Sequence, residues 1–448
     1  MNDYRGYDST PAARPAVALA SILLIALVFV VGVVVGQSGL LGGGDGGVAV
    51  RPTPTAPTLV PGSPSAPPSS PGPGATLPPD APLDFGLLFE ALEVIRQDYV
   101  GRSDLDVTAL THGAIRGLIE ALGDTAHSVF LTPEEADNEQ NALDGSVVGI
   151  GVLLGRREEQ VVIVSVISAS PAQAAGLRAG DELLTVDGQS ITGLETDQVA
   201  TRVRGEEGTD VTLSVARPST GETLDFTIAR ARIRIPAAAW SMVPGTDVAL
   251  LRLVQFSAGS GGELQQARNE AVAAGAQALI LDLRGNPGGF VDQAVDVSSL
   301  FVADSVVYIR ELADGERIPV QTNPAVEATD LPLVVLIDQN TASSGEITAG
   351  AIAAAGRALL VGQTTFGTGT ILLPFDLSDG SSIRLAVERW LTPEGEVIFG
   401  NGIAPDIEVA LPEDGVPVEP DALRDIAPED LDGLGDSQLL AALELLAP

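Results

Sequence analysis

The sequence predicts an α/β protein that is built from several units and carries one transmembrane helix. A run of twenty uncharged, mostly apolar residues at 16–35 matches the length of helix that crosses a bilayer core. From Val248 onward, the apolar runs VALLRLVQF, QALILDLRG and LPLVVLID alternate with helical sequence, which is typical of a buried sheet. Shorter strand patterns from Val147 onward indicate a separate unit ahead of that sheet.

The N-terminal region reads as a membrane anchor. We assign residues 1–15 to a cytoplasmic N-terminus and 16–36 to the transmembrane helix, because Arg5 and Arg14 precede the helix and basic residues mark the cytoplasmic side. A cleaved signal peptide is the alternative, although its apolar region usually spans only about 7 to 15 residues and no A-x-A-like site follows here. We therefore expect a single-pass protein of the cell membrane with most of the chain outside the cytoplasm.

Four further segments follow the anchor. Twelve of the 31 prolines lie between Pro52 and Pro82, mixed with Gly, Ser and Thr, and such a composition cannot bury a core. It predicts a stalk over 37–83. Apolar residues at helical spacing then predict a helical unit over 84–144. The remaining assignments are a strand-rich unit at 145–233, an α/β unit at 234–411 and an acidic C-terminal segment at 412–448.

The composition disfavours several classes of function. The chain has 60 acidic and 24 basic residues, a formal charge of -36, so binding to nucleic acid or to an anionic lipid surface is disfavoured. It has no cysteine, which excludes disulfides, thiolate metal sites and cysteine nucleophiles. All of the basic residues are arginine, so no lysine is available as a general base.

The strand-rich unit has a recognisable order of elements. GIGVLLG and VVIVSVI are followed by a short helix at SPAQAAG, then AGDELLTVDG, a second helix at ETDQVATRVRG and a final hairpin. This order, and above all AGLRAGDELLTVDG, resembles a PDZ domain in the circularly permuted form of bacterial proteases. The resemblance implies a module that holds peptide ends.

A peptide site is expected where the first glycines of this unit meet its second helix. The glycines of GIGV free the backbone to aim amides at an anionic peptide end, and a ligand would add as a strand beside them. A simple tight turn is the alternative explanation for these glycines. The expected peptide-binding residues are Gly149, Ile150, Gly151, Val152, Val199 and Val203.

Two segments of the α/β unit place small residues directly after a buried strand. In LILDLRGNPGG, a Gly-rich turn lets backbone amides approach a ligand or a developing oxyanion, although a structural turn has the same composition. In VVLIDQNTASSGEITAG, Ser343 stands at a helix start, where the dipole and free amides favour an attacking oxygen. Ser-x-x-Glu is also the capping-box pattern, so a helix cap is the alternative role for Ser343.

Five motifs extend this pattern: LDLRGNPGG, TASSGEI, GRALLVGQTTFGTGT, LSDGSSIRLAVERWLTPEG and GIAPDIEV. Together they resemble the C-terminal processing peptidase family of tail-specific serine proteases, over about 84–411. The resemblance implies a crotonase-like α/β core with an inserted PDZ domain, and cleavage of proteins presented by their C-terminal ends. It puts the nucleophile at Ser343 and the oxyanion hole at the amides of Gly288 and Ser344.

The sequence departs from this family at the catalytic base. The lysine that the family usually carries in FGKG is Thr368 here, and the glutamine usual four residues later is Leu372. Arginine is a poor replacement because it stays protonated at physiological pH. Another base is therefore needed, or the chain is inactive.

Histidine is the available alternative, because an imidazole titrates where a general base is useful. His127, in ALGDTAHSVFLTPEE, resembles in position the catalytic histidine of tricorn-type proteases, and Asn401 lies where that branch has its orienting carboxylate. A loop histidine with one structural hydrogen bond is the alternative for His127. His112 lies within a helix pattern and is expected to be structural.

The sequence thus predicts a membrane-anchored, extracytoplasmic serine endopeptidase whose PDZ domain binds proteins or peptides with free C-terminal ends. No H-E-x-x-H spacing occurs, so we expect no metal, and no cofactor is expected. The alternative is an inactive member of the family that acts as a peptide-binding adaptor or regulator.

Overall fold

The computed structural model describes residues 85–124, 127–157, 160–412, 415–424 and 426–447. The predicted cytoplasmic N-terminus, transmembrane helix and stalk, at 1–15, 16–36 and 37–83, lie outside these residues. Within the described ranges, none of the helices combines the length and the apolar character that crossing a bilayer requires.

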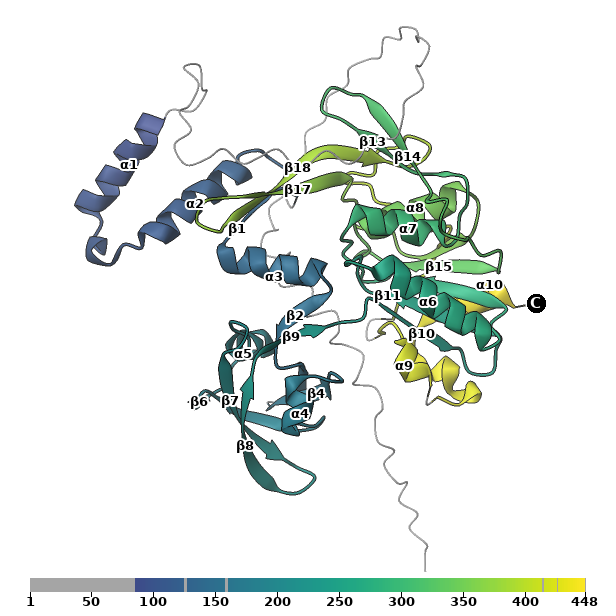
Figure 1. Cartoon of the computed structure of the whole chain (residues 1–448), viewed down its shortest axis with the longest axis horizontal. Helices are drawn as coiled ribbons and strands as arrows, with labels where there is room; N and C mark the ends of the chain where they lie inside the picture. The colour runs from purple at the N-terminus through teal and green to yellow at the C-terminus, as the bar shows by residue number, and fades with distance from the viewer. Residues whose placement is uncertain (1–84, 125–126, 158–159, 413–414, 425, 448) are drawn as a thin grey trace, which may run out of the picture.

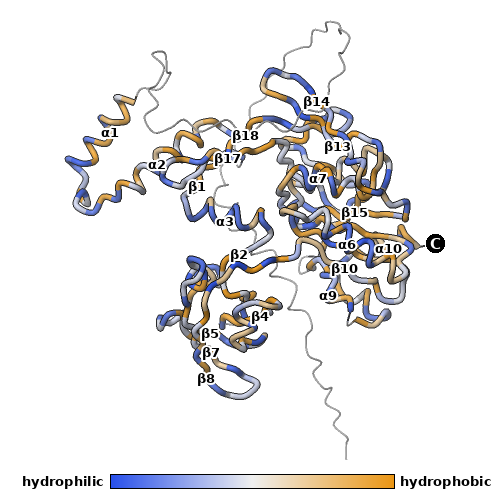
Figure 2. The backbone as a smooth tube through the Cα atoms, viewed as in Figure 1, coloured by the Kyte–Doolittle hydropathy of each residue, from blue (hydrophilic) through white to orange (hydrophobic). Residues whose placement is uncertain are grey.

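The N-terminal unit is helical and joins a sheet of the core through one short strand. Its α1 carries no buried residue, and Figure 2 shows apolar positions along that helix. The Thr132 hydroxyl and the Glu135 carboxylate form a capping box at the start of α3. The elements are α1 (Phe85–Asp98), η3 (Arg102–Asp104), α2 (Val107–Glu120), β1 (Val129–Leu131) and α3 (Pro133–Leu143).

The strand-rich unit is connected to the core by a two-stranded antiparallel ribbon, β2 (Ser146–Gly149) with β9 (Ala231–Arg234) (Figure 1). Its own sheet has the order β3-β4-β5-β7-β8, with β6 beside β5, so β3 lies at the edge. The elements are β3 (Val152–Arg157), β4 (Gln160–Val166), α4 (Pro171–Ala175), β5 (Glu182–Val186), β6 (Gln189–Ser190), α5 (Thr196–Val203), β7 (Asp210–Arg217) and β8 (Glu222–Ala229).

The core contains a six-stranded sheet of order β10-β11-β12-β15-β16-β19. β10 and β11 are antiparallel, and the other neighbours run parallel. β11, β12 and β15 are buried along their whole length, as the long apolar runs predicted. The strands are β10 (Ala238–Met242), β11 (Val248–Leu253), β12 (Ala278–Asp282), β15 (Leu333–Ile337), β16 (Leu359–Gly362) and β19 (Ile407–Glu408).

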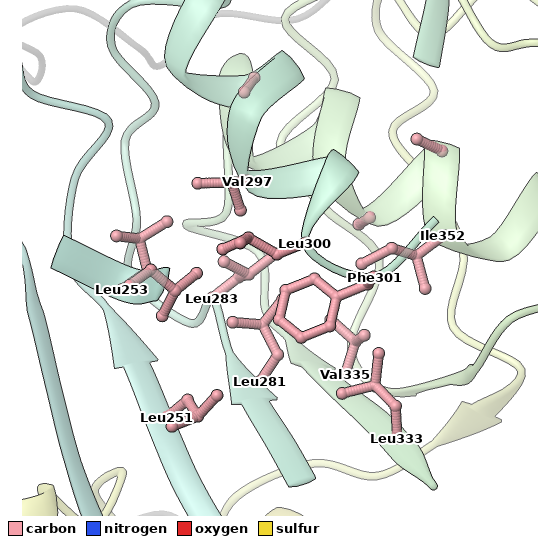
Figure 3. Close-up of a cluster of buried hydrophobic side chains, with 14 of the residues drawn as sticks. Leu251, Leu253, Leu281, Leu283, Val297, Leu300, Phe301, Leu333, Val335 and Ile352 are labelled. Atoms are coloured by element: carbon pink, nitrogen blue, oxygen red, sulfur yellow. The ribbon is translucent and has the colours of Figure 1, made fainter. Parts of the chain in front are cut away.

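Both faces of this sheet are covered. Successive side chains of a strand point to opposite sides, so the buried strands present apolar side chains to both faces. Leu251 and Leu281 belong to the cluster under α6, α7 and α8 (Figure 3), whereas Leu250 and Ile280 pack with Leu439 of the C-terminal segment. The covering helices are α6 (Ser260–Ala273), α7 (Val291–Ser299) and α8 (Ser344–Ala354) on one face, and α9 (Pro420–Leu423), η4 (Pro428–Leu434) and α10 (Ser437–Leu446) on the other. The acidic C-terminal segment therefore completes the core.

A second sheet connects the N-terminal unit with the core. β18 pairs with β1 and with β13, and it also forms a hairpin with β17. The hairpin begins directly after the FGTG segment, so it links that segment to β1. The strands are β13 (Val306–Glu311), β14 (Arg317–Gln321), β17 (Thr370–Asp376) and β18 (Ser382–Leu391).

Candidate active site

Ser343 lies at the N-terminus of α8, at the carboxyl end of the parallel strand β15. Its backbone adopts φ 51° and ψ −116°, a conformation that L-residues rarely take and that often marks functional positions. Ser343 is partly exposed, whereas Ser344 is fully buried and its Oγ donates to the carbonyl of Gly289 over 2.9 Å. Ser344 begins α8, where backbone amides lack intrahelical acceptors.

The Gly-rich turn after β12 packs directly against the serine. Gly288 has φ +97°, and a Cβ placed on it would lie 2.6 Å from the Cβ of Ser343. Only glycine fits this close approach. The amide of Gly288 donates to Oδ1 of Asn286 over 2.9 Å, so its predicted role in an oxyanion hole requires that hydrogen bond to yield to substrate. The two expected oxyanion residues thus flank Ser343.

Thr368, at the position where the family usually has lysine, lies beside Ser343. Its Oγ1 accepts a hydrogen bond from the amide of Ser343 over 3.2 Å. The carboxylate of Glu346 is fully buried and accepts from the amides of Ser343, Gly367 and Thr368 at 2.9, 2.7 and 2.9 Å. It also accepts from Oγ1 of Thr365 over 2.5 Å. Glu346 therefore fastens the FGTG segment to the start of α8.

His127 is buried, and its nearest charged neighbour is Asp124. Nδ1 of His127 lies 3.4 Å from Oδ1 of Asp124, and the other carboxylate oxygen accepts from the hydroxyl of Ser128 over 2.6 Å. The imidazole also packs against Phe399, with 4.9 Å between ring centroids. A carboxylate at Nδ1 orients the ring and favours the tautomer with Nε2 as the proton acceptor.

A continuous path of contacts joins His127 to Ser343. A Cβ on Gly369 would lie 2.6 Å from the amide nitrogen of Phe399, the residue whose ring packs on the imidazole. Gly369 adjoins Thr368, which bonds the amide of Ser343. These contacts connect the segment that carries His127 with the FGTG segment beside Ser343, with the Phe399 ring next to the imidazole.

The β17–β18 hairpin places Leu372 beside the same region. Leu372 pairs with Ala386 of β18, and the amide of Ala386 donates to the hydroxyl of Ser128, the residue after His127. The position where the family usually has glutamine therefore lies across one strand from the segment that carries the histidine.

The carboxylate that lies at Nδ1 of His127 is Asp124, a residue that the sequence analysis did not single out. Asn401, the residue predicted for this role, is exposed, and its Nδ2 donates to the carbonyl of Val397 over 3.3 Å. Asp124 stands three residues before His127 in the same ALGDTAH segment, so local spacing was the available signal. The role of Asn401 stays a prediction.

The expected peptide site has a free strand edge but a buried helix face. Gly151 has φ +85°, and a side chain there would collide with Ser170, which explains the need for glycine. β3 exposes one edge for an added strand, as β-augmentation requires. Val199 and Val203 of α5 are 0% and 5% exposed, so they pack into the core of the unit and support α5 from beneath. Ile150, 1% exposed, likewise belongs to that core.

His112, expected to be structural, connects two units. Its Nε2 lies 2.9 Å from the carboxylate of Asp379, in the turn between β17 and β18, and its ring packs on Phe130. As for metals, the part of the chain that the structure describes contains no group of three or more His, Asp or Glu side chains suited to hold an ion.

Comparisons with known proteins show which family the chain belongs to. The sequence profile of peptidase family S41 matches residues 247–409, and that of the PDZ domain matches residues 162–217. The chain is 34% identical over 331 residues to the carboxy-terminal processing protease CtpA of Bacillus subtilis (strain 168), which covers 73% of this chain and 70% of that protein. It is 33% identical over 323 residues to the probable CtpA-like serine protease of Staphylococcus aureus (strain COL), covering 72% and 64%.

Among solved structures, the photosystem II D1 C-terminal processing protease is 29% identical, with a TM-score of 0.44, and the match covers 73% of this chain and 94% of that one. The chain spans 70% and 64% of the length of the two bacterial relatives. The chain belongs to peptidase family S41, the carboxy-terminal processing serine peptidases, and carries a PDZ domain.

Proposed function

We propose that this protein is a membrane-anchored serine endopeptidase that works outside the cytoplasm and cleaves proteins near C-terminal tails held by its PDZ domain. In this proposal Ser343 is the nucleophile and His127 its general base, in place of the usual lysine. The observation that carries it is the pairing of a buried His127 with Asp124, in a region connected by contacts to Ser343.

The proposed reaction follows the general logic of serine hydrolases. Nε2 of His127 takes the proton from Oγ of Ser343 as that oxygen attacks the scissile carbonyl, while Asp124 holds the ring at Nδ1. The amides of Gly288 and Ser344 stabilise the oxyanion. The imidazolium then protonates the departing amine, and water hydrolyses the acyl-enzyme by the same route. Phe399, 44% exposed, packs on the imidazole and is therefore a side chain that any movement of His127 would displace.

The test uses the full chain in detergent with an unfolded protein substrate and a fluorophosphonate that modifies reactive serines. Wild type should cleave the substrate and carry the probe on Ser343, and Ser343→Ala should do neither. His127→Ala should lose about 10² to 10⁴ in kcat, the usual contribution of general base catalysis. Cleavage that survives His127→Ala would remove the histidine from the mechanism.

Two matched variants decide which residue orients the ring. Asp124→Asn should lower kcat by at least about tenfold, because the negative charge at Nδ1 is lost. Asn401→Ala should leave kcat within about twofold, since its contact is with a backbone carbonyl. The opposite ranking would restore the role first predicted for Asn401.

The second candidate function is an inactive family member that binds peptide ends as an adaptor. Two observations favour it: Thr368 replaces the lysine, and the amide of Gly288 already bonds Asn286. In that case the wild type takes up no probe and cleaves nothing across pH 5 to 9, while labelled peptides with free C-terminal ends still bind. Binding lost after amidation of the peptide end would then identify the adaptor activity.

A further inference from the structure

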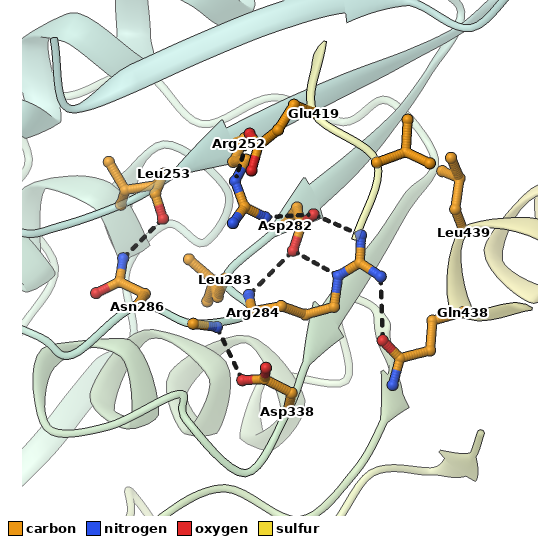
Figure 4. A network of polar contacts seen from close by, with 12 residues as sticks. Arg252, Leu253, Asp282, Leu283, Arg284, Asn286, Asp338, Glu419, Gln438 and Leu439 are labelled. Atoms are coloured by element: carbon orange, nitrogen blue, oxygen red, sulfur yellow. Dashed lines mark hydrogen bonds and ion pairs between the residues drawn. The ribbon is translucent and has the colours of Figure 1, made fainter. Parts of the chain in front are cut away.

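The C-terminal segment contributes polar groups to a network around Arg284 that adjoins the Gly-rich turn. Figure 4 shows Glu419 and Gln438 in this network, and Asp436 belongs to it as well. At its centre is Arg284, which is fully buried and follows β12 by two residues. Nε and Nη2 of Arg284 donate to the carboxylate of Asp282 over 2.9 and 2.7 Å. Nη1 and Nη2 donate to the carboxylate of Asp436 over 2.8 and 3.0 Å. The guanidinium thus bridges one carboxylate from β12 and one from the distant C-terminal segment.

Asp436 is itself held rigidly by its own segment. Its carboxylate caps α10 by accepting a hydrogen bond from the amide of Leu439 over 3.0 Å. The same carboxylate accepts a second one from the amide of Val418 over 2.8 Å. The side chain is 1% exposed. With two backbone amides and a guanidinium around it, this carboxylate has a defined position from which it can restrain Arg284.

A short chain of bonds leads from Arg284 to the nucleophile. The next residue, Gly285, donates its amide to Asp338 over 2.8 Å. The carbonyl of Asn286 accepts from the amide of Ala342, the residue before Ser343, over 2.9 Å. The Asn286 side chain also positions the amide of Gly288. A shift of Arg284 would therefore move both the amide of Gly288 and the backbone before Ser343.

The charge balance explains why Asp436 matters. Arg284 cannot lose its proton, and the positive charge of a fully buried guanidinium needs anionic partners. Without the charge of Asp436, Asp282 would be the one carboxylate left on Arg284 among the described residues. Asp282 also pairs with Arg252, whose other carboxylate partner is Glu419. The guanidinium would then move toward Asp282 and draw the turn with it.

We propose that Asp436 is a positioning residue for catalysis, which through Arg284 holds the 285–288 turn in register with Ser343. This inference rests on the proposed function of that serine. It makes the C-terminal segment a part of the catalytic unit, in addition to a cover for one face of the sheet.

The test compares Asp436→Asn with Leu439→Ala in the full chain in detergent. Asparagine also caps helices well, so with its Oδ1 toward the amide of Leu439 the first variant keeps the start of α10. It removes the charge together with the acceptor that faces Val418 and Nη2 of Arg284. Leu439 is buried on the same helix, and its truncation removes packing without touching Arg284. Leu439→Ala therefore controls for a loss of stability alone.

Asp436→Asn should react with the fluorophosphonate at least about tenfold more slowly and lose a similar factor in kcat with little change in KM, because only the oxyanion geometry changes. Leu439→Ala, at a temperature well below its unfolding, should stay within about threefold of wild type in both. Asp436→Glu should recover part of the rate by restoring the charge.

Hydrogen exchange separates this inference from the proposed function, because it needs no catalysis. In Asp436→Asn the amides of Gly285, Asn286 and Gly288 and those of 342–346 should exchange faster, with those of α6 unchanged. If wild type never takes up the probe but this pattern appears, the proposed chemistry fails and the positioning role stands. The inference is overturned if Asp436→Asn shows the same hydrogen exchange as the wild type. It is also overturned if Leu439→Ala, at the same loss of stability, slows labelling as much as Asp436→Asn does.

Discussion

At the scale of single residues, several hydrogen bonds fix the backbone at the start of α8. Ser343 keeps its unusual φ of 51° while its amide bonds both Glu346 and Thr368. A threonine in the FGTG segment therefore substitutes for the usual lysine as a structural contact, but its hydroxyl is no base at neutral pH. This is the physical reason why activity requires a second group, such as His127.

The first prediction concerns Gly288. Gly288→Ala should abolish labelling of Ser343, because the new Cβ would lie 2.6 Å from the Cβ of that serine and displace it. Gly259→Ala is the matched control, since Gly259 also has a positive φ, +83°, but open space around its Cβ. The control should cost about 1 to 3 kcal/mol from backbone strain and keep its reactivity. Equal labelling in both variants would contradict the close approach.

The second prediction concerns a buried ion pair in the PDZ domain. Burial raises the pKa of the Asp181 carboxyl, but the hydrogen bonds and charge of Arg217 outweigh burial and hold that pKa below its usual value. A lowered pKa in the folded state contributes stability above the unfolded value of about 3.9. That stability is lost as the pH falls through the folded pKa.

Asp181→Asn should therefore destabilise the PDZ domain at pH 7 by about 3 kcal/mol, because Arg217 keeps a buried charge without its partner. The free energy of unfolding should also fall less steeply with decreasing pH, because the variant has no Asp181 carboxylate to protonate. Denaturant unfolding from pH 2 to 7, followed by hydrogen exchange in β5 and β7, measures both effects. Glu206→Gln, an exposed change in the same domain, should leave the profile as it is.

At the scale of elements, the β17–β18 hairpin connects the FGTG segment to the helical unit. Its turn carries Asp379, whose pKa is held well below its usual range by hydrogen bonds from Ser381 and from His112 on α2. The carboxylate of Asp379 is therefore ionised at neutral pH. Strand β1 adds a second attachment through its pairing with β18.

The third prediction is that Asp379→Asn loosens α2. Hydrogen exchange of residues 107–120 should speed up by about fivefold at pH 7, because the charge-assisted contact with His112 is lost. Thr108→Ala, an exposed change on the same helix, should leave exchange near wild type. Unchanged exchange in Asp379→Asn would mean that the other contacts with β18, through β1, Ser128 and the Glu139–Arg384 pair, hold the helical unit without it.

At the scale of the whole molecule, the PDZ domain and the protease core each have their own hydrophobic cluster and meet through the β2–β9 ribbon. The covering of both sheet faces makes the core a closed unit that includes residues 415–447. Removal of the acidic C-terminal segment would therefore expose one whole face of the sheet.

The fourth prediction tests the proposed anchor at 16–36. The chain has no cysteine, so one introduced cysteine is a unique tag. In intact cells, a membrane-impermeant maleimide should label Ser70→Cys in the stalk and leave Ser9→Cys unlabelled, as the distribution of arginines predicts. Both proteins should stay in the membrane fraction after alkaline extraction. Labelling at position 9 alone would reverse the proposed orientation.

The sequence by itself determined the family, the PDZ domain and the central sheet, because these depend on local patterns. Apolar runs specify β11, β12 and β15, and the Gly-rich and Ser-rich motifs mark the turns that follow two of them. Ser343 and Gly288 were found in this way, since each belongs to a contiguous motif.

Only the tertiary structure decided the partners of these residues. The contact path through Phe399 and the bridge from Arg284 to Asp436 join segments that no spacing rule connects. The same holds for Val199, which helical periodicity cannot assign to groove or core. Side-chain partners arise from the packing of distant elements, and that packing has no local signature in the chain.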